Sequence, residues 1–438
     1  MKHAAGRIRH PWLWVPSAYL AEGIPFAMVI WVAGTMFKDL GHSDGQITVA
    51  TASIGIAWSL KPFWAAFLDM YRTKKFFVLA MEVLMALLLA GIALCLPLPN
   101  YFQIAIAALW VLAFASATQD ICVDGIYITS LDEKRQAAFI GVQGVFWNVG
   151  RIFGTAVVVW LAGSLKEDQG LSTQAAWAWA LGLAALSLGL LALYHALMLP
   201  SGAVTQRPQS LAEIGRTFAD SVLDFFRKPS IWGMLAFVFF YRSSEGLLLI
   251  EGPLFLQASP ESGGIGLTLK EKGLIDGTIS TAVSLVAGLL GGAFVARWGL
   301  NRRTLVIMAL CLNLPHITYV ILSQLAGTGH ALSLWTVATL VTIEKFGYSF
   351  GFVANMLYMM QQVSPGRYHM THYAFCTALM NLMLVPTQAI SGPLADLLGY
   401  RSYFILVMFA AIPSVLAACF APFPRRPLPA AAPVKDSR

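Results

Sequence analysis

Long hydrophobic stretches recur along the whole chain and are separated by short polar segments. Each is about 20 residues long or longer, the length that an α-helix needs to cross the hydrocarbon layer of a bilayer. The pattern predicts an all-α membrane protein with twelve transmembrane helices. The expected spans are 12–37, 46–68, 76–96, 101–128, 137–162, 175–199, 230–257, 270–296, 303–325, 334–362, 370–394 and 402–421.

The longest polar segment between spans, Ser201 to Pro229, divides the helices into two groups of six. This division predicts two six-helix bundles joined by a linker. The expected units are an N-terminal bundle at 1–199, a linker at 200–229, a C-terminal bundle at 230–422 and a cytoplasmic tail at 423–438.

The linker carries the pattern of an amphipathic helix. Ser210 and Glu213 have the spacing of a helix-capping box, and apolar residues then recur at helical spacing up to Phe225. We expect a helix that lies along the cytoplasmic membrane surface. The alternative is a mobile linker whose periodicity is incidental.

The two halves resemble one another in places. Glu22-Gly23 in the first span matches Glu245-Gly246 in the seventh, and a basic turn follows both the second and the eighth span. These repeats indicate an internal duplication, so the two bundles are expected to be pseudo-symmetric, with a transport pathway between them.

The positive charges predict the orientation. Hydrophobic residues make up 58% of the chain and charged residues only 12%. Most Lys and Arg residues lie in alternate loops and at the two termini, which places both termini in the cytoplasm. The net charge of +7 follows this rule, so no nucleic-acid partner is expected. The other loops hold only Lys38, Lys166, Lys270, Lys272 and Arg401.

Two further features bear on targeting and redox chemistry. The first apolar stretch begins at Pro11 after a short basic leader without a small-residue cleavage pattern, so we expect a retained helix rather than a signal peptide. The five cysteines lie in or at the ends of spans without CxxC spacing. They are expected to be small buried hydrophobes without disulfides.

The fourth span contains two acids, Asp120 and Asp124, which share a helical stripe with Tyr127. An ionisable side chain at the centre of a membrane helix costs roughly 3 kcal/mol, so such residues usually serve a function. Asp120 lies near the middle of the span and is our first candidate for proton coupling. Asp124 lies one turn closer to the cytoplasm and is expected in a gate.

The fifth span suggests a sugar-binding face. Gln143, Trp147 and Arg151 recur at helical spacing, with Asn148 beside them. An aromatic ring covers the apolar side of a sugar, amides bind its hydroxyl and N-acetyl groups, and a guanidinium binds a carboxylate. The alternative is a salt bridge from Arg151 to Asp120 or Glu22, with Trp147 as packing.

Other polar residues within the spans have weaker assignments. Glu22 has no cation nearby in its own helix and is the second candidate for proton coupling, with a hydrogen bond to a neighbouring helix as the alternative. Lys61 and Glu82, near the cytoplasmic ends of their spans, are expected in a gate or as a packing pair. Further candidate ligand-binding residues are Tyr19, Tyr127, Glu245, Tyr348, Asn355, Asn381 and Gln388.

Each of these assignments has a structural alternative. Arg242 and Glu245 have the spacing of a pair that neutralises itself, whereas the adjacent Glu344 and Lys345 point about 100° apart and are not expected to pair. Asn381 and Gln388 are equally suited to hydrogen bonds between helices. The HxxH spacing of His369 and His372 lacks a nearby acid, so no metal site and no cofactor is expected.

With twelve spans in two similar halves, the chain resembles the major facilitator superfamily over its whole set of spans. The loops after the second and eighth spans are similar to its signature G-x-x-x-D-R-x-G-R-R/K, and the resemblance implies a gate that includes Asp69 and Arg72. The first loop keeps the acid and the trailing Lys74 and Lys75, whereas the second has Ala296 in place of the acid.

Within this superfamily, Thr118-Gln-Asp-Ile-Cys-Val-Asp-Gly resembles a segment of the AmpG-type permeases and the related acetyl-CoA and siderophore importers. The stretch from Phe346 to Pro393 looks like spans 10 and 11 of the same group. The resemblance implies proton-coupled import, across the inner membrane, of cell-wall fragments with N-acetylglucosamine and anhydro-N-acetylmuramic acid. It further implies a small-molecule substrate, and we expect a monomer in the lipid bilayer.

Three alternatives to this function are considered. A ferric-siderophore importer belongs to the same family, and a transporter-like sensor would bind its ligand without net flux. A membrane enzyme is disfavoured, because the chain has neither H-E-x-x-H nor G-x-S-x-G and no loop long enough for a soluble catalytic site.

Overall fold

The computed structural model describes residues 10–61, 63, 64, 68, 73–131, 133–202, 211–326, 332–366 and 368–424. These residues form α-helices with short 3-10 and π-helical turns, and the described part of the chain contains no β-strand. The expected gate residues Asp69 and Arg72, and most of the expected tail, lie outside the described residues.

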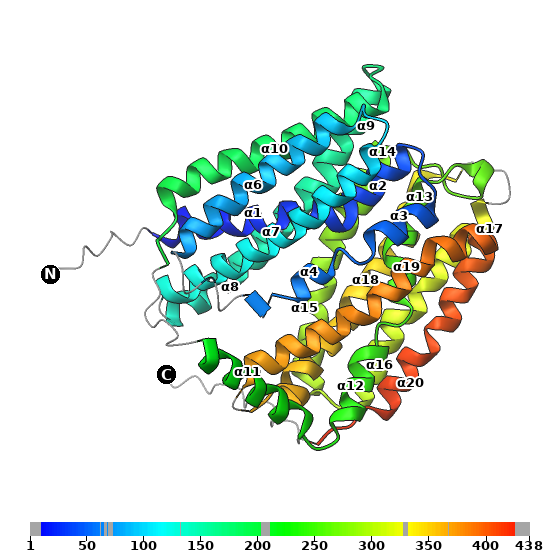
Figure 1. Ribbon diagram of the computed structural model, residues 1–438. Helices are drawn as coiled ribbons and strands as arrows, with labels where there is room; N and C mark the ends of the chain where they lie inside the picture. Colours follow the sequence, from blue (N-terminus) through cyan, green and yellow to red (C-terminus); the bar gives the residue numbers. More distant parts are fainter. Residues whose placement is uncertain are drawn as a thin grey trace, which may run out of the picture.

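The helices of the N-terminal half run back and forth between the two ends of the molecule (Figure 1). They are η1 (Pro11–Leu13), α1 (Val15–Ala27), η2 (Met28–Val32), α2 (Ala33–Asp39), α3 (Asp44–Thr51), α4 (Ile56–Ser59), α6 (Lys74–Cys95), α7 (Tyr101–Ser130), α8 (Glu133–Ile152), η3 (Phe153–Val158), α9 (Val159–Glu167) and α10 (Thr173–Met198).

The C-terminal half is built in the same way. After the linker helix α11 (Leu211–Phe226) it contains α12 (Ile231–Phe240), α13 (Glu245–Gln257), η4 (Pro260–Ser262), α14 (Leu269–Lys272), η5 (Gly273–Ile279), α15 (Ser280–Trp298), α16 (Arg302–Asn313), η6 (Leu314–His316), α17 (Ile317–Ala326), α18 (Leu334–Tyr358), η7 (Met359–Val363), α19 (His369–Ala410) and α20 (Ile412–Phe420).

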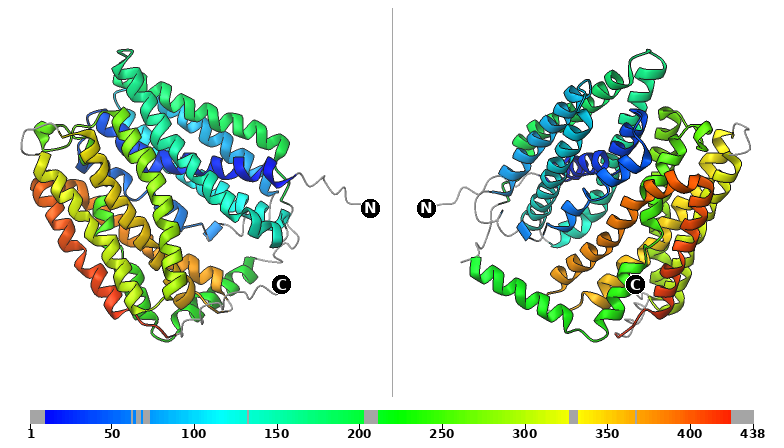
Figure 2. Two further views of the ribbon diagram at one scale, coloured as in Figure 1. Left: turned by 180° about the vertical axis from the view of Figure 1, so that it is seen from behind. Right: turned by 45° about the vertical axis from the view of Figure 1, so that its right-hand side comes forward.

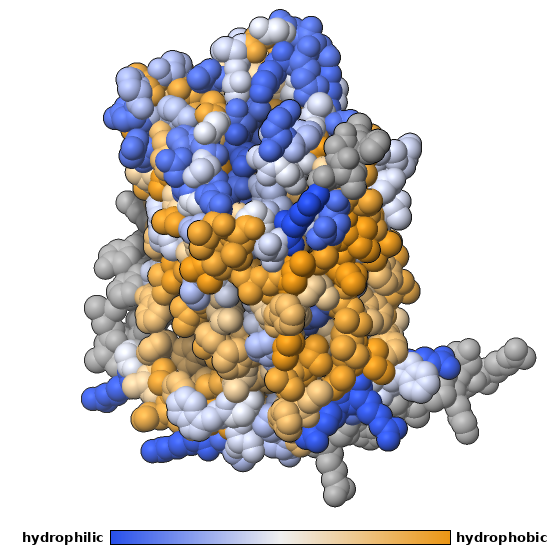
Figure 3. All heavy atoms as spheres, turned by 90° about the vertical axis from the view of Figure 1, so that its right-hand side faces the viewer, coloured by the Kyte–Doolittle hydropathy of each residue, from blue (hydrophilic) through white to orange (hydrophobic). Residues whose placement is uncertain are grey.

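The helices are long and apolar enough for a multi-pass membrane protein. Among the described residues, nine helical stretches have the length and composition to cross a bilayer. One of them, Thr371–Phe420, contains two expected spans, because Gly399 interrupts the helix with φ 70° and ψ 152°. The expected span 46–68 is described only in part, and the span 334–362 forms α18 and η7 but is not among these nine stretches, so the exact count of twelve stays a prediction. Hydrophobic side chains form a belt between two hydrophilic ends (Figure 3).

The two halves form two bundles that meet at one end of the molecule and diverge toward the other (Figures 1 and 2). We call the first the closed end; there α2 packs against α13, α3 against α19 and α9 against α14. The other is the terminal end, where the described chain begins and ends and where α11 lies. The predicted arrangement in two helical bundles is therefore confirmed, whereas the number of six membrane-spanning helices in each bundle stays a prediction.

The linker helix forms at the predicted place and links the two bundles at the terminal end. The Phe218 ring of α11 lies 5.8 Å from the rings of Phe63 and Phe375, which belong to different bundles. Lys228, just after α11, donates hydrogen bonds to backbone carbonyls after α18, including that of Val363 at 2.5 Å. The alternative of a linker without fixed structure does not hold for 211–226.

Within the N-terminal bundle, α1 and α8 touch backbone to backbone at two glycines. A Cβ atom at Gly150 would lie 3.0 Å from the Cα atom of Gly23 and would overlap the carbonyl oxygen of Leu20. Packing between membrane helices relies on such small residues, because lipid supplies no hydrophobic force between the helices. This contact fixes the position of Arg151, the next residue of α8.

We predict that Gly150→Ala lowers the free energy of unfolding by about 1–3 kcal/mol, because the added methyl group overpacks this contact. Gly144→Ala in the same helix is the matched control, since a Cβ atom there meets no other described atom within 4 Å. The control should change stability by less than about 0.5 kcal/mol. Thermal unfolding in detergent measures both, and equal melting temperatures for the two variants would contradict the packing argument.

Candidate functional site

A cavity of about 100 Å³ lies between the two bundles, at about half the length of the helices that form its walls. One wall comes from η2, α8 and η3 of the N-terminal bundle, and the other walls come from α13, η5, α15 and α18. The lining residues are Trp31, Arg151, Thr155, Leu249, Pro253, Asp276, Ser280, Thr281, Ser284, Lys345, Tyr348 and Ser349.

Arg151 is the cation of the N-terminal wall. It lies where α8 passes into the π-helical turn η3, a local widening that is frequent at functional sites. Its guanidinium carbon lies 5.3 Å from the centre of the Trp31 ring, a cation–π distance. Its Nε atom is buried without a hydrogen-bond partner, and no described carboxylate is within ion-pair distance. Arg151 is therefore available to an anion.

The opposite wall begins with a second π-helical turn, η5, which presses against η3. A Cβ atom at Gly277 would lie 2.9 Å from the Cα atom of Ala156, so only glycine allows this contact. The same turn carries Asp276, which interacts electrostatically with both Arg151 and Lys345. One acid thus faces two cations across the cavity.

The third wall, α18, supplies Lys345, Tyr348 and Ser349. The Lys345 Nζ atom lies 3.3 Å from a carboxylate oxygen of Glu344, which corrects the expectation that these neighbours do not pair. The flexible four-carbon stem of lysine reaches back to the preceding side chain despite the angle between the two Cβ directions. Lys345 is consequently partly neutralised, unlike Arg151.

A buried ion pair stands behind this wall. Arg242 donates to both carboxylate oxygens of Glu245, as their spacing predicted, and lies 3.5 Å from the Tyr348 hydroxyl oxygen. Both charged side chains are almost fully buried, and Glu245 does not line the cavity. This pair holds Tyr348 in place rather than contacting a ligand itself.

A second polar group lies within the N-terminal bundle. Lys61 forms an ion pair with Asp120, so Arg151 is not the partner of Asp120. The Tyr19 hydroxyl donates to Asp124 at 2.8 Å and accepts a hydrogen bond from Gln143 at 2.7 Å. The alternative of a salt bridge between Arg151 and Asp120 or Glu22 is therefore absent from the described contacts.

Glu22 is buried beside this group. It is 4% exposed, and its Oε1 atom has no hydrogen-bond partner among the described residues. Asp124 and Lys61 are close enough to interact with it electrostatically. A buried carboxyl without a full set of donors is unstable as an anion, which favours its neutral form.

Glu82 has a packing role instead of pairing with Lys61. Its carboxylate accepts a hydrogen bond from Gln119 at 2.9 Å and lies 2.7 Å from the Nδ1 atom of His195. All three side chains are fully buried between α6, α7 and α10. This arrangement corrects the expectation of a Lys61–Glu82 pair and holds three helices of one bundle together.

Of the predicted ligand-binding residues, only Arg151 and Tyr348 line the cavity. Trp147 packs on Phe26 at 5.3 Å, and Asn148 donates to the carbonyl of Gly144 in its own helix. Asn381 donates to Ser59 across the bundles, in line with the alternative of an interhelical hydrogen bond. The remaining candidates, Tyr19, Tyr127, Gln143, Asn355 and Gln388, lie apart from the cavity.

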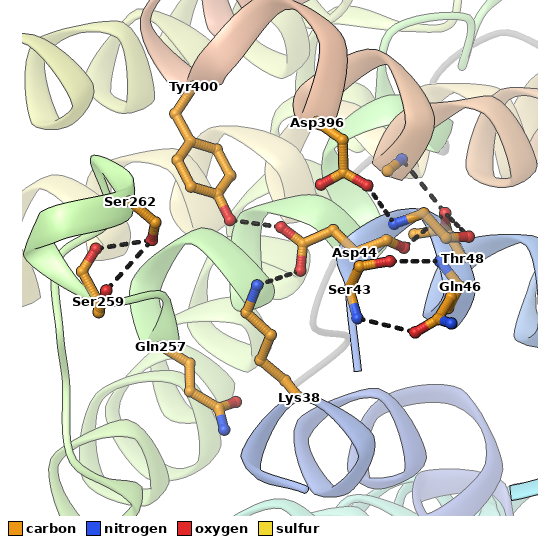
Figure 4. Close-up of polar contacts among 12 residues, drawn as sticks. Lys38, Ser43, Asp44, Gln46, Thr48, Gln257, Ser259, Ser262, Asp396 and Tyr400 are labelled. Carbon is orange, nitrogen blue, oxygen red and sulfur yellow. Dashed lines mark hydrogen bonds and ion pairs between the residues drawn. The ribbon is translucent and has the colours of Figure 1, made fainter. Parts of the chain in front are cut away.

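The closed end carries a gate of polar contacts between the bundles (Figure 4). Asp44 at the start of α3 accepts hydrogen bonds from Lys38 and from Tyr400 of the C-terminal bundle. Asp396 of α19 accepts the backbone N–H of Gly45 at 3.0 Å, so it binds the positive N-terminus of α3. These contacts seal the cavity from this end.

A second contact at the closed end lies outside the hydrophobic belt. Lys270 donates to Asp168 at 2.5 Å and thereby lowers the pKa of that carboxyl below its usual value. Asp168 is exposed, so this pair adds little to stability. The pair instead joins the two bundles, because Asp168 lies in a loop of one bundle and Lys270 in the first turn of α14 in the other.

Sequence reasoning missed several of these residues. Trp31 looks like an ordinary membrane aromatic, Lys345 is adjacent to an acid with which no pairing was expected, and Glu251 of α13 is a lone acid without a motif. The gate was expected only at the cytoplasmic ends, where Asp124, Lys61, Glu82, Asp69 and Arg72 were assigned. The gate at the closed end had one signal in the sequence, which is the set of polar residues on both sides of loop 40–43.

Comparisons with known proteins agree with this geometry. The chain is 22% identical over 410 residues to "Putative transporter AmpG 4" of Rickettsia conorii, and the match covers 90% of this chain and 92% of that relative. It is also 22% identical to the "Anhydromuropeptide permease" of Escherichia coli K12, with 90% of this chain and 76% of the relative covered.

Solved structures show the same fold. A mutant of the nucleoside transporter NupG matches with a TM-score of 0.70 at 14% identity, covering 93% of this chain and 98% of that chain. A bacterial homologue of the human lysosomal transporter Spinster also matches with a TM-score of 0.70, at 16% identity and with 95% and 98% covered.

These relatives and solved structures are all named as transporters or as a permease, in line with the expectation that the chain is not an enzyme. The family model described as Major Facilitator Superfamily matches residues 17–382, most of both bundles. With two bundles around a central cavity and a match of this length, the chain belongs to the major facilitator superfamily.

Proposed function

We propose that this protein imports cell-wall-derived amino sugars or muropeptides, of the N-acetylmuramic acid or anhydro-muropeptide type, across the cytoplasmic membrane, driven by the proton gradient. Both termini then lie in the cytoplasm, and the closed end faces outward. The relative named as an anhydromuropeptide permease supports the substrate class.

The observation that carries the proposal is the Arg151 guanidinium beside Trp31, which has no carboxylate within ion-pair distance among the described residues and interacts with Asp276 only at longer range. Muramic acid derivatives contain a lactyl or peptide carboxylate next to a sugar ring. The guanidinium binds such a carboxylate through two parallel hydrogen bonds, and the Trp31 ring offers an apolar face to the sugar. The hydroxyl groups of Ser280, Ser284 and Thr155 suit the polar edges of the ring.

The size of the cavity adds a constraint. About 100 Å³ is well below the roughly 300–1,000 Å³ of ordinary ligand pockets. The ligand-bound state therefore needs a wider space between the bundles, which already diverge toward the terminal end (Figure 2). In the proposed cycle, the closed end is the outer gate and the terminal end is the opening to the cytoplasm.

The proton-coupling role suits Glu22 better than Asp120. Asp120 is paired with Lys61, whereas Glu22 is buried and its Oε1 atom has no donor among the described residues. A carboxyl that is neutral when buried and ionised when water reaches it loads and unloads a proton as the bundles move.

The first prediction concerns transport. Proteoliposomes with this protein should accumulate N-acetylmuramic acid or an anhydro-muropeptide faster with an inward proton gradient than without one, because proton entry drives symport. A ferric siderophore is the comparison substrate. If only the siderophore is taken up, the substrate is a ferric siderophore and not a cell-wall sugar. If a ligand binds but none is taken up, the protein is a sensor.

The second prediction concerns Arg151. Arg151→Gln should weaken binding of N-acetylmuramic acid about 10- to 100-fold, since a hydrogen bond between charged groups contributes roughly 1.5–3 kcal/mol. Asn148→Ala, three residues away and bonded within its own helix, is the control and should bind normally. Isothermal titration calorimetry measures both. Unchanged affinity in Arg151→Gln would exclude Arg151 as the anion site.

The third prediction separates coupling from binding. Glu22→Gln should abolish proton-driven accumulation and keep substrate exchange across the membrane without a gradient, because the carrier still alternates but no longer releases a proton. Asp120→Asn should retain proton-driven accumulation. The opposite result, with Asp120→Asn uncoupled and Glu22→Gln normal, would return the coupling role to Asp120.

A further inference from the structure

Glu251 of α13 is a buried acid at the closed end that neither the cavity nor the N-terminal polar group uses. It is fully buried, and both of its carboxylate oxygens lack a hydrogen-bond partner among the described residues. It lies less than two turns before Gln257 and the loop at the closed end, and it interacts electrostatically with Asp44 of the other bundle. Its position therefore places a carboxyl group inside the gate.

The groups around Glu251 come from five different elements. The charged groups and phenols that face it, or face its own stretch of α13, are Lys38 of α2, Asp44 of α3, Lys272 of α14, Tyr319 of α17, and Asp396, Tyr400 and Tyr403 of α19.

Most of these groups already have partners. Asp44 takes the hydrogen bonds of Lys38 and Tyr400, and Asp396 is bound to the N-terminus of α3. Lys272 donates to the Pro253 carbonyl at 2.6 Å. The Tyr403 hydroxyl donates to the Leu247 carbonyl at 2.6 Å. The Tyr319 hydroxyl has no hydrogen-bond partner in the described part of the chain and lies against Gly252, beside Glu251 in sequence.

The charge balance disfavours an ionised Glu251 in the closed gate. Two acids, Asp44 and Asp396, stand near it, and the nearby Lys38 is bound to Asp44. A buried anion without donors costs several kcal/mol, and a second carboxylate close by raises this cost. The neutral carboxylic acid pays neither the cost of a buried anion nor that of repulsion by Asp44, so the closed gate favours the neutral form of Glu251.

Opening reverses this preference. Asp44 belongs to the N-terminal bundle and Glu251 to the C-terminal bundle, so separation of the bundles at the closed end moves the two acids apart and admits water. A hydrated carboxyl ionises near its ordinary pKa, and a proton that is bound only in one conformation shifts the equilibrium toward that conformation.

We propose that Glu251 is the proton-binding residue of the closed-end gate: the gate closes over the neutral acid, and the ionised form holds it open. The proposal rests on the alternating-access part of the proposed function but not on its substrate. Proton binding at Glu251 is separate from that at Glu22, because the two residues lie in different bundles and toward opposite ends.

The test measures the width of the gate directly. Spin labels at Gln169→Cys and Glu261→Cys, exposed positions in closed-end loops of the two bundles, report their separation in a chain whose five natural cysteines are replaced by alanine. In otherwise unmodified protein without substrate, the ratio of long to short distances should rise with pH by up to about tenfold per pH unit, as for a single proton.

The isosteric variant Glu251→Gln should keep the short distance at every pH, because its side chain is always neutral. Asp44→Asn is the matched control in the same gate: it weakens the bond to Tyr400 across the bundles and widens the gate. It should keep a pH response with its midpoint at lower pH, because burial still favours the neutral acid without the second carboxylate. If Glu251→Gln does not fold, Glu251→Met supplies a neutral apolar side chain of similar volume and should also stay closed.

Three results would overturn the proposal: no pH response in the unmodified gate, a normal response in Glu251→Gln or Glu251→Met, or loss of the response in Asp44→Asn. The measurement contains no substrate. A protein that fails to transport muropeptides and still shows the Glu251-dependent response would therefore disprove the substrate class and leave the gate assignment intact.

Discussion

The structure depends on one constraint, which is that the bilayer offers no water to a charged side chain. Each ionisable residue within the spans must find a partner or face a polar space, or it would cost several kcal/mol. Lys61 meets Asp120, Arg242 meets Glu245 and Lys345 meets Glu344. Arg151 differs from these cations because it has no carboxylate within ion-pair distance among the described residues, and for this reason we propose the cavity as the anion site.

The contact between the bundles at the closed end is suited to breaking and re-forming. Gly392 brings the backbone of α19 against that of Asp44 in α3, since a Cβ atom there would overlap the Asp44 carbonyl. Leu254 and Leu269 of the C-terminal bundle pack in one apolar cluster with residues of the N-terminal bundle. Polar links such as Asp44 to Tyr400 and Asp396 to Gly45 set the register of this contact, and water replaces such links when the bundles part.

The fold could be predicted from the sequence because it follows from length and periodicity. Apolar stretches of span length, the long polar linker and the repeated Glu-Gly pairs together led to two bundles, and even α11 formed where its apolar face predicted it. The amphipathic pattern is local, and local patterns are readable in a single chain.

The site could be predicted only in part, because it depends on which faces of distant helices meet. Arg151 was found because a cation in an apolar helix is conspicuous, whereas the pairing of Asp120 with Lys61 was not predicted, because the two residues lie on different helices. Trp31 and Asp276 come together only through the contact of the turns η3 and η5, and both turns are π-helical, a departure that periodicity does not reveal.

The helix α13 joins the gate to the cavity. Leu249 and Pro253 line the cavity, and Glu251 lies between them in sequence but on the buried side of the gate. Pro253 has no N–H group to bind the carbonyl of Leu249, so the helix is weakest at this turn. A change of charge at Glu251 acts on the same turn that shapes the cavity wall. If Glu251 binds the proposed proton, the gate and the cavity share one helical turn, and the proton acts on the cavity wall without direct contact with a ligand.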